Sequence, residues 1–334
     1  MRAVPVGVAG VGRLGREHAR ILAGLEGASL VGVHDVDEER GRSVADAAGV
    51  PFRPDLGPLL DACEALVVAV PTAAHHGVAR RALEAGVHVL AEKPLAASLE
   101  EADDLVSLSE DRGLTLAVGH VERFNPAVRS AEPHLDGPRF IESLRLAPFQ
   151  PRGTDVNVVL DLMIHDIDLV LGLVGVPVAS LDAVGTPVLT DSVDIANARL
   201  TFGDGTVAEI TASRVSEERL RVLRLFQPSG YLKLDLAAGR GEFLRRRTVP
   251  GTAGAATADG TGSRVPSLAD IVERIPLRGD GREPLTLELE AFLAAVRGEA
   301  SPVVSAREGR AALEVALRIG RSIQRFADVA LEAT

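Results

Sequence analysis

The amino-acid sequence predicts an α/β protein made of two domains. The first, residues 1–120, is built on a parallel sheet, and the second, residues 121–334, is an α+β domain with a large, mostly antiparallel open sheet. Three observations predict this fold. Apolar runs of strand length alternate with helical segments in the first half, a glycine-rich turn follows the first run, and apolar and polar residues alternate along the runs of the second half.

The composition excludes several classes of protein. The 334 residues are 46% hydrophobic and 25% charged, as in an ordinary soluble globular protein, and the net charge of -11 argues against a nucleic-acid surface. The single Cys63 cannot form an internal disulfide, so we expect a reducing, cytoplasmic compartment. A strand-like run follows Met1 and Arg2 directly, and no signal peptide is expected. The most apolar stretch, 156–178, carries four ionisable side chains and is not expected to span a membrane.

The first half predicts alternating strands and helices. The expected strands are 4–9, 30–34, 65–70, 88–91 and 114–118, and the expected helices include 13–25, 73–85 and 99–111. Ser98 and Glu101 have the spacing of a capping box at the start of the third helix. This alternation predicts βαβ units and a parallel sheet, and the continuously apolar strands predict that both of its faces are covered.

A glycine-rich turn joins the first strand to the first helix. Gly10, Gly12 and Gly15 form a GxGxxG pattern, with Arg13 and Leu14 before the third glycine. In this context the pattern predicts a Rossmann domain, because the glycines let the backbone approach a pyrophosphate and the helix N-terminus offers unpaired N–H groups. The alternative is a tight βα turn without a ligand.

An acidic residue ends the second predicted strand. Asp35 lies 20 residues after Gly15, where a carboxylate binds the hydroxyls of the adenosine ribose. A carboxylate at this place repels a 2′-phosphate, so we expect NAD as the cofactor in preference to NADP.

The second half predicts a different arrangement. The expected strands are 140–146, 178–184, 195–202, 206–214, 220–226 and 231–236. We expect one long apolar helix over 153–175, closing helices over 286–297 and 306–326, and a loop rich in Gly, Ala and Thr over 250–262. A sheet with one covered face predicts association through the other face, as a homodimer or homotetramer.

Lysine is rare in this chain, and one copy stands at the end of an apolar run. Lys93 and Lys233 are the two lysines, against 34 arginines. A lysine ammonium shifts its pKa readily on partial burial, whereas an arginine stays charged. Lys93 is therefore a candidate for handling a proton or polarising a substrate, and the alternative is a surface lysine.

Ionisable residues also interrupt the long apolar helix. Asp161 and His165 are four residues apart and lie on one face, and Asp168 lies near the same stripe. A histidine, with a pKa of about 6.5, suits the removal of a proton from an alcohol, and Asp161 can orient its imidazole. The alternatives are a buried Asp–His pair that ties the helix to its neighbours, or a metal site that includes His120. We predict no metal, because a lysine can polarise the alcohol oxygen.

Three motifs together resemble the Gfo/Idh/MocA family of oxidoreductases. They are the GxGxxG turn, the Glu92-Lys93-Pro94 element and the pair Asp161 and His165, and the resemblance covers nearly the whole chain. It implies that Lys93, Asp161 and His165 are catalytic and that the Lys93–Pro94 bond is cis. The cofactor contacts that it implies are Gly10, Gly12, Arg13, Leu14, Gly15, Asp35, Pro71, Thr72, His75, Glu92 and Lys93.

Within that family, 120–126 and 161–168 resemble a sugar-nucleotide branch that includes the UDP-N-acetylglucosamine 3-dehydrogenases. The branch implies NAD-dependent oxidation of a secondary alcohol on a sugar or sugar nucleotide to a ketone. The substrate contacts that it implies are Lys93, Arg123, Asn125, Arg152, Thr154, Asp155, Asp161 and His165. Two alternatives stay open: an inositol or free-sugar dehydrogenase, and a non-catalytic NAD-binding sensor or regulatory subunit.

Overall fold

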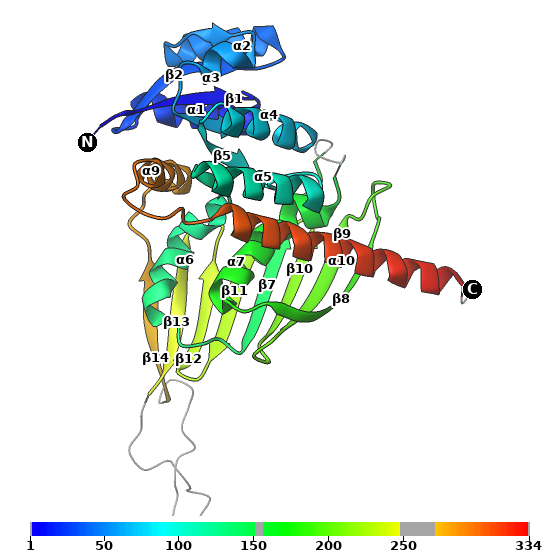
Figure 1. The fold of residues 1–334 in the computed structure, drawn as a ribbon. Helices are drawn as coiled ribbons and strands as arrows, with labels where there is room; N and C mark the ends of the chain where they lie inside the picture. The colour runs from blue at the N-terminus through cyan, green and yellow to red at the C-terminus, as the bar shows by residue number, and fades with distance from the viewer. Residues whose placement is uncertain (1, 151–155, 248–270, 333–334) are drawn as a thin grey trace, which may run out of the picture.

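Two sheets with their covering helices form the molecule (Figure 1). The structure is a computed structural model and describes residues 2–150, 156–247 and 271–332, with side chains as far as Phe326. Within these ranges, no helix is both long enough and apolar enough to cross a membrane.

The first sheet is parallel and has six strands in the order β3-β2-β1-β4-β5-β6. Its elements, in chain order, are β1 (Val4–Ala9), α1 (Arg13–Gly24), β2 (Ala28–His34), α2 (Glu38–Ala48), β3 (Phe52–Arg53), α3 (Leu56–Leu60), β4 (Ala65–Val68), α4 (Thr72–Glu84), β5 (His88–Glu92), α5 (Leu99–Arg112) and β6 (Leu116–Gly119). The five predicted strands and three predicted helices are confirmed, with their ends moved by a few residues. Because helices cover both faces, β4 and β6 are buried along their whole length.

Local side-chain bonds explain where two of these helices begin. The Asp37 carboxylate accepts the backbone N–H of Arg40 at 3.0 Å and starts α2. At α5, the Ser98 hydroxyl accepts the N–H of Glu101 at 3.2 Å, as the capping box predicts. The Glu101 carboxylate, however, accepts from Ala97 at 3.0 Å, one residue earlier than the reciprocal bond of that motif, so half of it is present.

The second sheet has eight strands in the order β14-β13-β12-β11-β7-β10-β9-β8. Its strands are β7 (Phe140–Leu146), β8 (Val178–Thr186), β9 (Ile195–Phe202), β10 (Val207–Ser213), β11 (Leu220–Gln227), β12 (Gly230–Asp235), β13 (Arg240–Arg246) and β14 (Val272–Arg278). Among its described strands only the β7–β10 pair is parallel, so the prediction of a mostly antiparallel sheet is confirmed. β13 and β14 were not predicted, because charged residues interrupt the apolar alternation in both strands and Pro276 interrupts it further in β14.

The long helix predicted over 153–175 is shorter than expected. A π-helical turn, η3 (Val159–Met163), precedes α7 (Ile164–Val174), and residues 153–155 lie outside the described ranges. The Asn157 side chain accepts the N–H groups of Val159 and Leu160, both at 3.1 Å, and so caps the helix at this point. The predicted loop 250–262 also lies outside the described residues.

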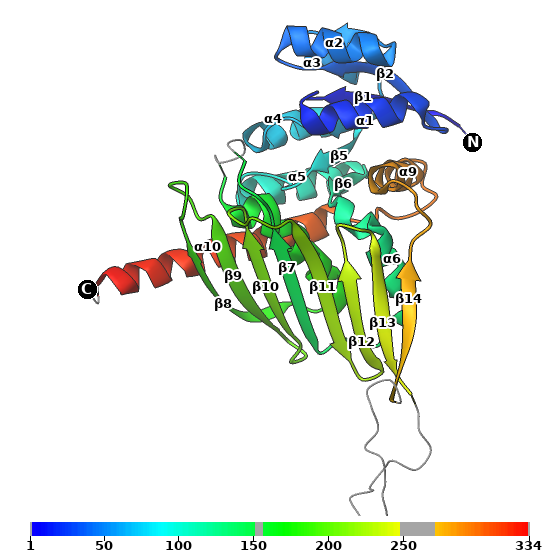
Figure 2. The same cartoon turned by 180° about the vertical axis from the view of Figure 1, so that it is seen from behind.

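Helices cover one face of the second sheet. Side chains from α7 and α10 (Ala306–Glu332) pack with inward residues of the strands, such as Ile141 and Phe202, in one apolar core. Among the described residues, no helix covers the opposite face of this sheet (Figure 2).

The last part of the chain returns to the first domain. Leu289 and Phe292 of α9 (Pro284–Val296) share an apolar core with Val4 and Leu22, and Leu313 of α10 belongs to the core around β4 and β5. The last strand of the parallel sheet ends at Gly119, and α9 and α10, which follow the second sheet in the chain, pack back against the first one.

A buried ion network fixes α7 against the second sheet. Arg145 of β7 donates to both carboxylate oxygens of Asp166, at 2.6 and 3.0 Å, and to Glu122 of η1 (Val121–Phe124) at 2.9 Å. The Arg145 and Asp166 side chains are 2% and 1% exposed. Such a network holds a helix in one register, because moving it leaves buried charges unpaired.

We expect Arg145→Met to lower the free energy of unfolding by roughly 3–5 kcal/mol, because it leaves the buried Asp166 carboxylate without its cation and Glu122 with the longer contact to Arg221 at 3.4 Å. The matched control is Arg199→Met, which removes an exposed pair with Glu209 on the same sheet and should cost less than about 1 kcal/mol. Chemical denaturation followed by circular dichroism measures both. Equal transition midpoints for the two variants would contradict the role given to Arg145.

Candidate active site

The turn between β1 and α1 is shaped for a ligand that approaches the backbone. Gly10 has a φ of +83°, and a Cβ placed there would lie 2.6 Å from the Val70 nitrogen. A Cβ on Gly15 would lie 1.8 Å from the Gly10 oxygen, so helix and turn pack too closely for any side chain. Gly12 has no atom within 4 Å of such a Cβ. Two of the glycines thus close the turn, and the third leaves room beside it.

The start of α1 can bind an anion. No side chain caps this helix at Gly12, and Arg13 and Leu14 are exposed in its first turn. The first N–H groups of a helix have no partner within the helix, and its dipole favours negative charge at this end. The turn and the helix together fit the pyrophosphate of a dinucleotide.

Asp35 is bound more tightly than the sequence analysis expected. Its carboxylate accepts the backbone N–H groups of Val11 at 2.7 Å and Asp37 at 2.9 Å, and Arg40 donates to it at 2.6 Å. Burial by itself raises the pKa of Asp35, but the bonds from Arg40, Asp37 and Val11 outweigh it and lower the pKa overall. The carboxylate therefore stays ionised and holds the glycine turn against the end of β2.

Arg40 is a residue that the sequence analysis missed. Its guanidinium pairs with Asp35 and also lies 3.1 Å from the Asp37 carboxylate. Arg40 partly neutralises the Asp35 carboxylate. The expected repulsion of a 2′-phosphate depends on the negative charge of that carboxylate. Arg40 stands five residues after Asp35, in the first turn of α2. This spacing in the sequence could have indicated that the two side chains pair.

Glu92 and His75 lie beneath the predicted cofactor site and are buried. Glu92, at the end of β5, binds Nε2 of His18 at 2.7 Å. His75 of α4 has its ring nitrogens 2.8 Å from the Pro94 carbonyl oxygen and 2.9 Å from that of Val70. The Glu92 bond ties the end of β5 to α1, and the His75 bonds tie α4 to the segments that follow β4 and β5, so both side chains act within the protein in this structure. Pro71 is exposed and Thr72 half-buried at the start of α4.

Lys93 meets the second domain. The Lys93–Pro94 bond is cis, as the resemblance implies. The Lys93 ammonium donates to the backbone oxygen of Asp161 at 2.5 Å and lies 3.8 Å from the Asp161 carboxylate. Burial lowers the pKa of Lys93, and the charges of Asp161 and Glu92 offset this effect only in part. The structure thus brings together two of the three predicted catalytic residues.

His165 lies in the first turn of α7, four residues after Asp161. The positive charge of Lys93 acts on its imidazole. Burial lowers the pKa of His165 well below its usual value, and the charges of Lys93 and Arg145 lower it further. A neutral imidazole can accept a proton. Among the described residues, none makes a hydrogen bond to its buried Nδ1. The expected support from Asp161 is therefore absent in this structure, because the Asp161 main chain and side chain both face Lys93.

Arg123 and Asn125 are placed differently from the substrate contacts that the resemblance implies. Arg123 binds both carboxylate oxygens of Asp168, at 2.6 and 2.9 Å, and Asp168 is 1% exposed. The Asn125 amide donates to Glu122 and to the Leu236 carbonyl, each at 2.8 Å, and its oxygen caps α6 (Pro126–Ala131). The side chains of Arg123, Asn125 and Asp168 thus form hydrogen bonds to other groups of the protein. Buried polar groups are normally paired in this way.

Three further substrate contacts are implied by the resemblance. Arg152, Thr154 and Asp155 lie outside the described residues.

One group of possible metal ligands is found in the described part of the chain, away from the predicted one. Ligand atoms of His18, Glu92 and Glu288 lie within 4.8 Å of one another, whereas Asp161, His165 and His120 form no such group. Burial raises the pKa of Glu288 well above its usual value, and Glu92 adds to this effect. A protonated Glu288 removes one of the two buried negative charges, so the group does not require a cation.

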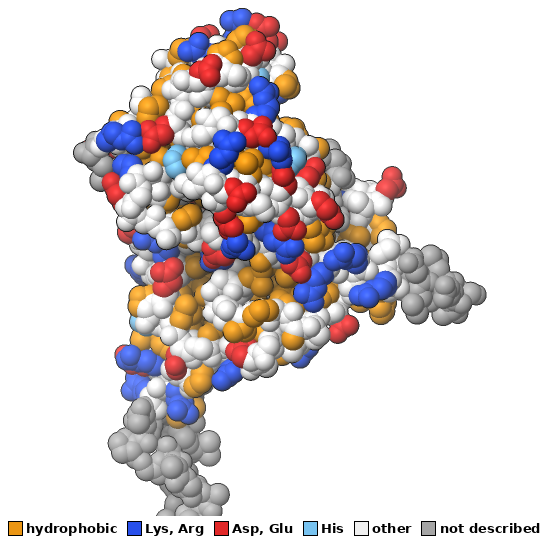
Figure 3. Space-filling view, in the orientation of Figure 1, with side chains coloured by type: hydrophobic (Ala, Val, Ile, Leu, Met, Phe, Trp, Pro, Cys, Tyr) orange, Lys and Arg blue, Asp and Glu red, His pale blue; other side chains and the backbone are white. Residues whose placement is uncertain are grey.

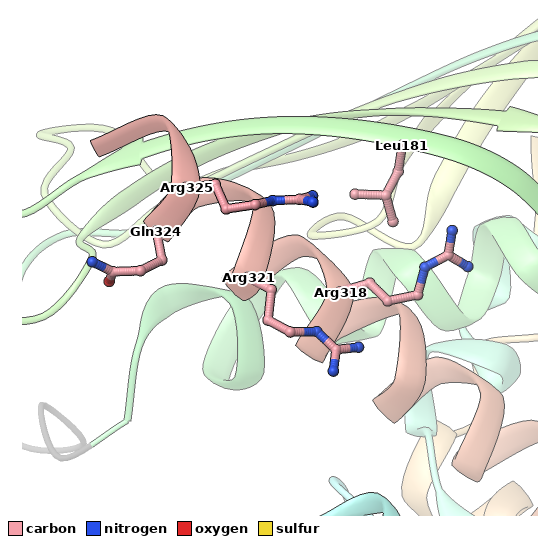
Figure 4. Close-up of a pocket in the computed structure, with 5 residues that line it drawn as sticks. All are labelled: Leu181, Arg318, Arg321, Gln324 and Arg325. Carbon is pink, nitrogen blue, oxygen red and sulfur yellow. The ribbon is translucent and has the colours of Figure 1, made fainter. Parts of the chain in front are cut away.

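A cavity of about 510 Å³ lies outside this site (Figure 4). It is lined by Leu181, Arg318, Arg321, Gln324 and Arg325. Basic side chains also gather over the exposed part of α10 in the space-filling view (Figure 3). The cavity belongs to β8 and α10, and neither element carries a predicted site residue.

Comparison with known proteins identifies the family. Residues 4–120 match the model of the oxidoreductase family with an NAD-binding Rossmann fold, and residues 129–230 match the GFO/IDH/MocA C-terminal domain. The UDP-N-acetylglucosamine 3-dehydrogenase of Acidithiobacillus ferrooxidans is 37% identical over 321 residues, which cover 96% of this chain and 97% of that protein. The scyllo-inositol 2-dehydrogenase (NAD(+)) of Bacillus subtilis is 26% identical over 97% of this chain and 95% of its own length.

Solved structures agree with this result. UDP-N-acetylglucosamine 3-dehydrogenase GnnA from Acidithiobacillus ferrooxidans superposes with a TM-score of 0.87 at 34% identity, covering 98% of this chain and 99% of that one. A scyllo-inositol dehydrogenase from Lactobacillus casei, solved with bound cofactor NAD(H) and scyllo-inositol, shares the fold with a TM-score of 0.76 at 19% identity, over 97% and 98% of the two chains. The chain belongs to the Gfo/Idh/MocA family of oxidoreductases, and its first domain is an NAD-binding Rossmann domain.

Proposed function

We propose that this protein is an NAD-dependent dehydrogenase that oxidises the 3-hydroxyl of UDP-N-acetylglucosamine to a ketone. The contact of Lys93 with the Asp161 backbone oxygen supports the proposal, since Asp161 stands four residues before His165 in the chain and the charge of Lys93 acts on the His165 imidazole. The relative at 37% identity, whose name states this activity, supports the choice of substrate.

The proposed cofactor site lies along the glycine turn. Gly10, Gly12 and Gly15 shape the backbone for a pyrophosphate, and Asp35 accepts the adenosine ribose hydroxyls. Pro71 and Thr72 stand at the start of α4 on the same edge of the sheet.

The proposed chemistry divides between two side chains. His165 takes the proton of the alcohol, because its depressed pKa keeps it neutral at pH 7. Lys93 donates a hydrogen bond to the same oxygen and stabilises it as the carbonyl forms. NAD, when bound, supplies the hydride acceptor. Asp161 holds Lys93 in place through its backbone oxygen and its charge.

The molecule is also proposed to associate through the bare face of the large sheet. On that face Phe226 lies between Phe140 and Tyr231, with ring centroids 5.6 and 5.2 Å apart. A homodimer or homotetramer that covers these rings removes apolar surface from water. We further propose a division into domains at 120/121 and a cytoplasmic location, which the single cysteine supports.

An inositol or free-sugar dehydrogenase is the second candidate. The 26% identity to scyllo-inositol 2-dehydrogenase over 97% of this chain favours it over other free alcohols. An assay of the two substrate classes separates it from the first proposal.

With NAD present, we expect saturable NADH formation from UDP-N-acetylglucosamine and little from free N-acetylglucosamine or inositols. His165→Ala should lower kcat by roughly 10²–10⁴ while NADH still binds, because the general base is lost and the cofactor site is not. Absorbance at the NADH band measures turnover, and His134→Ala is the matched control. If only inositols are turned over, the protein is an inositol dehydrogenase and the proposed substrate is wrong. If NAD binds and none of the substrates is turned over, the protein is a sensor.

For the cofactor, we expect Asp35→Ala to raise the preference for NADP over NAD at least about tenfold, because Arg40 then has a guanidinium to offer to the 2′-phosphate. The matched control is Asp35→Ala combined with Arg40→Ala, which should lose this gain. Fluorescence titration of NADH and NADPH measures both affinities. An unchanged ratio in the single variant would remove Asp35 from the ribose site.

For the assembly, we expect the protein to sediment as a dimer or tetramer, and Phe226→Asp to shift it toward the monomer by burying a charge in the interface. Val303→Asp, at a half-exposed site away from that face, is the control. Analytical ultracentrifugation gives the masses. A monomeric parent protein would end the proposal.

A further inference from the structure

His120 stands beside the proposed catalytic lysine without a role in the chemistry given so far. It follows Gly119, the last residue of β6, and Gly119 is paired in register with Glu92 of β5. His120 and Lys93 are therefore the next residues of two neighbouring parallel strands. They lie at the carboxyl edge of the sheet, where ligands bind in this class of fold.

The His120 ring is buried with unpaired polar atoms. Its exposed fraction is 0%, and neither ring nitrogen has a hydrogen-bond partner in the described part of the chain. Buried polar atoms are normally paired, and a fully buried residue cannot contact a substrate that enters from solvent. The His120 ring nitrogens therefore require a partner in the interior of the folded protein, either a side chain or a buried water.

Among the described residues, His165 is the one aromatic ring that packs against His120, and its buried Nδ1 is unpaired as well. The two ring centroids are 6.5 Å apart and the planes meet at 89°. Nδ1 of His165 has no partner among the described residues, and no direct bond joins the two rings. A water molecule between them can accept or donate at both nitrogens.

The proposed reaction requires such a partner. When Nε2 of His165 takes the proton of the alcohol, the ring becomes an imidazolium that is partly buried and close to Lys93, and both conditions disfavour it. A general base of this kind is usually oriented by a third group at its other nitrogen. Asp161 does not fill that place, because no hydrogen bond joins it to His165 and its own backbone oxygen holds Lys93.

We propose that His120 is the positioning residue of His165, joined to it through one hydrogen-bonded water at Nδ1. The inference rests on the proposed function. As the proton arrives at Nε2, the Nδ1–H donates to this water, and the water donates to a neutral His120. His120 keeps its role as an acceptor and takes up no proton. The bond also selects the tautomer of His165 that leaves Nε2 unprotonated and ready to react.

The surroundings keep His120 neutral. Burial lowers its pKa, and the nearby cations oppose protonation while the carboxylates favour it. The charged groups that face His120 are Glu92, Lys93, Arg123 and Asp168. The titratable groups that face His165 are Lys93, Arg145, His120 and Arg221, and a protonated His120 would lower the pKa of His165. Arg123 is already paired with Asp168, which reduces the influence of that carboxylate on His120.

The test compares His120→Phe, which keeps a ring without nitrogen, with His120→Gln, which keeps an acceptor, and with His134→Phe as the matched control. We expect His120→Phe to lower kcat about 10–100-fold, less than the roughly 10²–10⁴ for loss of the base itself. KM and NADH affinity should stay within about twofold. His120→Gln should recover part of kcat.

Two readouts separate positioning from a merely structural effect. Because burial keeps His120 neutral, His120→Phe removes a hydrogen-bond acceptor and no positive charge. The imidazolium of His165 is then less stable, so its pKa falls further and the acid limb of the kcat–pH profile should move to lower pH. In nitrogen-15 histidine spectra of the protein without cofactor, His120→Phe should change the tautomer ratio of His165.

An unchanged kcat, pH profile and tautomer ratio in His120→Phe would overturn the inference, and so would equal losses in the Gln and Phe variants together with a lower melting temperature. A parent protein that turns over no sugar nucleotide contradicts the proposed function instead. In that case the tautomer measurement still decides whether His120 orients His165.

Discussion

The bond between the Lys93 ammonium and the Asp161 backbone oxygen, at 2.5 Å, is the constraint on which the rest of the site depends. It crosses from the carboxyl edge of the parallel sheet to the first turns of the helix that covers the second sheet. A backbone oxygen cannot be moved by a change of rotamer, so the position of Lys93 is linked to the register of η3 and α7. The buried network of Arg145, Asp166 and Glu122 then fixes that register against β7.

Burial gives the two ionisable groups of the site their properties. Removal from water disfavours the charged form of both Lys93 and His165, and each also senses other charges. For Lys93 the carboxylates of Asp161 and Glu92 partly restore the cation. His165 faces cations, so the effects add and the imidazole stays neutral. The same environment thus favours Lys93 as a hydrogen-bond donor and His165 as a proton acceptor. The dehydrogenation of an alcohol needs both groups.

The apolar helix with four ionisable residues shows two uses of buried charge. Asp166 and Asp168 bind Arg145 and Arg123 and hold the helix in place, whereas Asp161 and His165 face the first domain. From spacing alone, Asp168 could equally have belonged to the site. The arginines that pair with Asp166 and Asp168 come from β7 and η1, more than 20 residues away in the chain.

Local pattern by itself was enough to establish the parallel domain, the glycine turn, most strands of the second sheet and the candidacy of Lys93 and His165. These features depend on periodicity, turn residues and the chemistry of single side chains. The charged strands β13 and β14, the π-helical start of α7 and the return of α9 to the first domain depend on contacts between distant segments. The same holds for the pairing of Arg40 with Asp35, of Arg123 with Asp168 and of His120 with the ring of His165. Which polar group meets which is set by the folded chain, because burial forces each charge to find a partner wherever the fold supplies one.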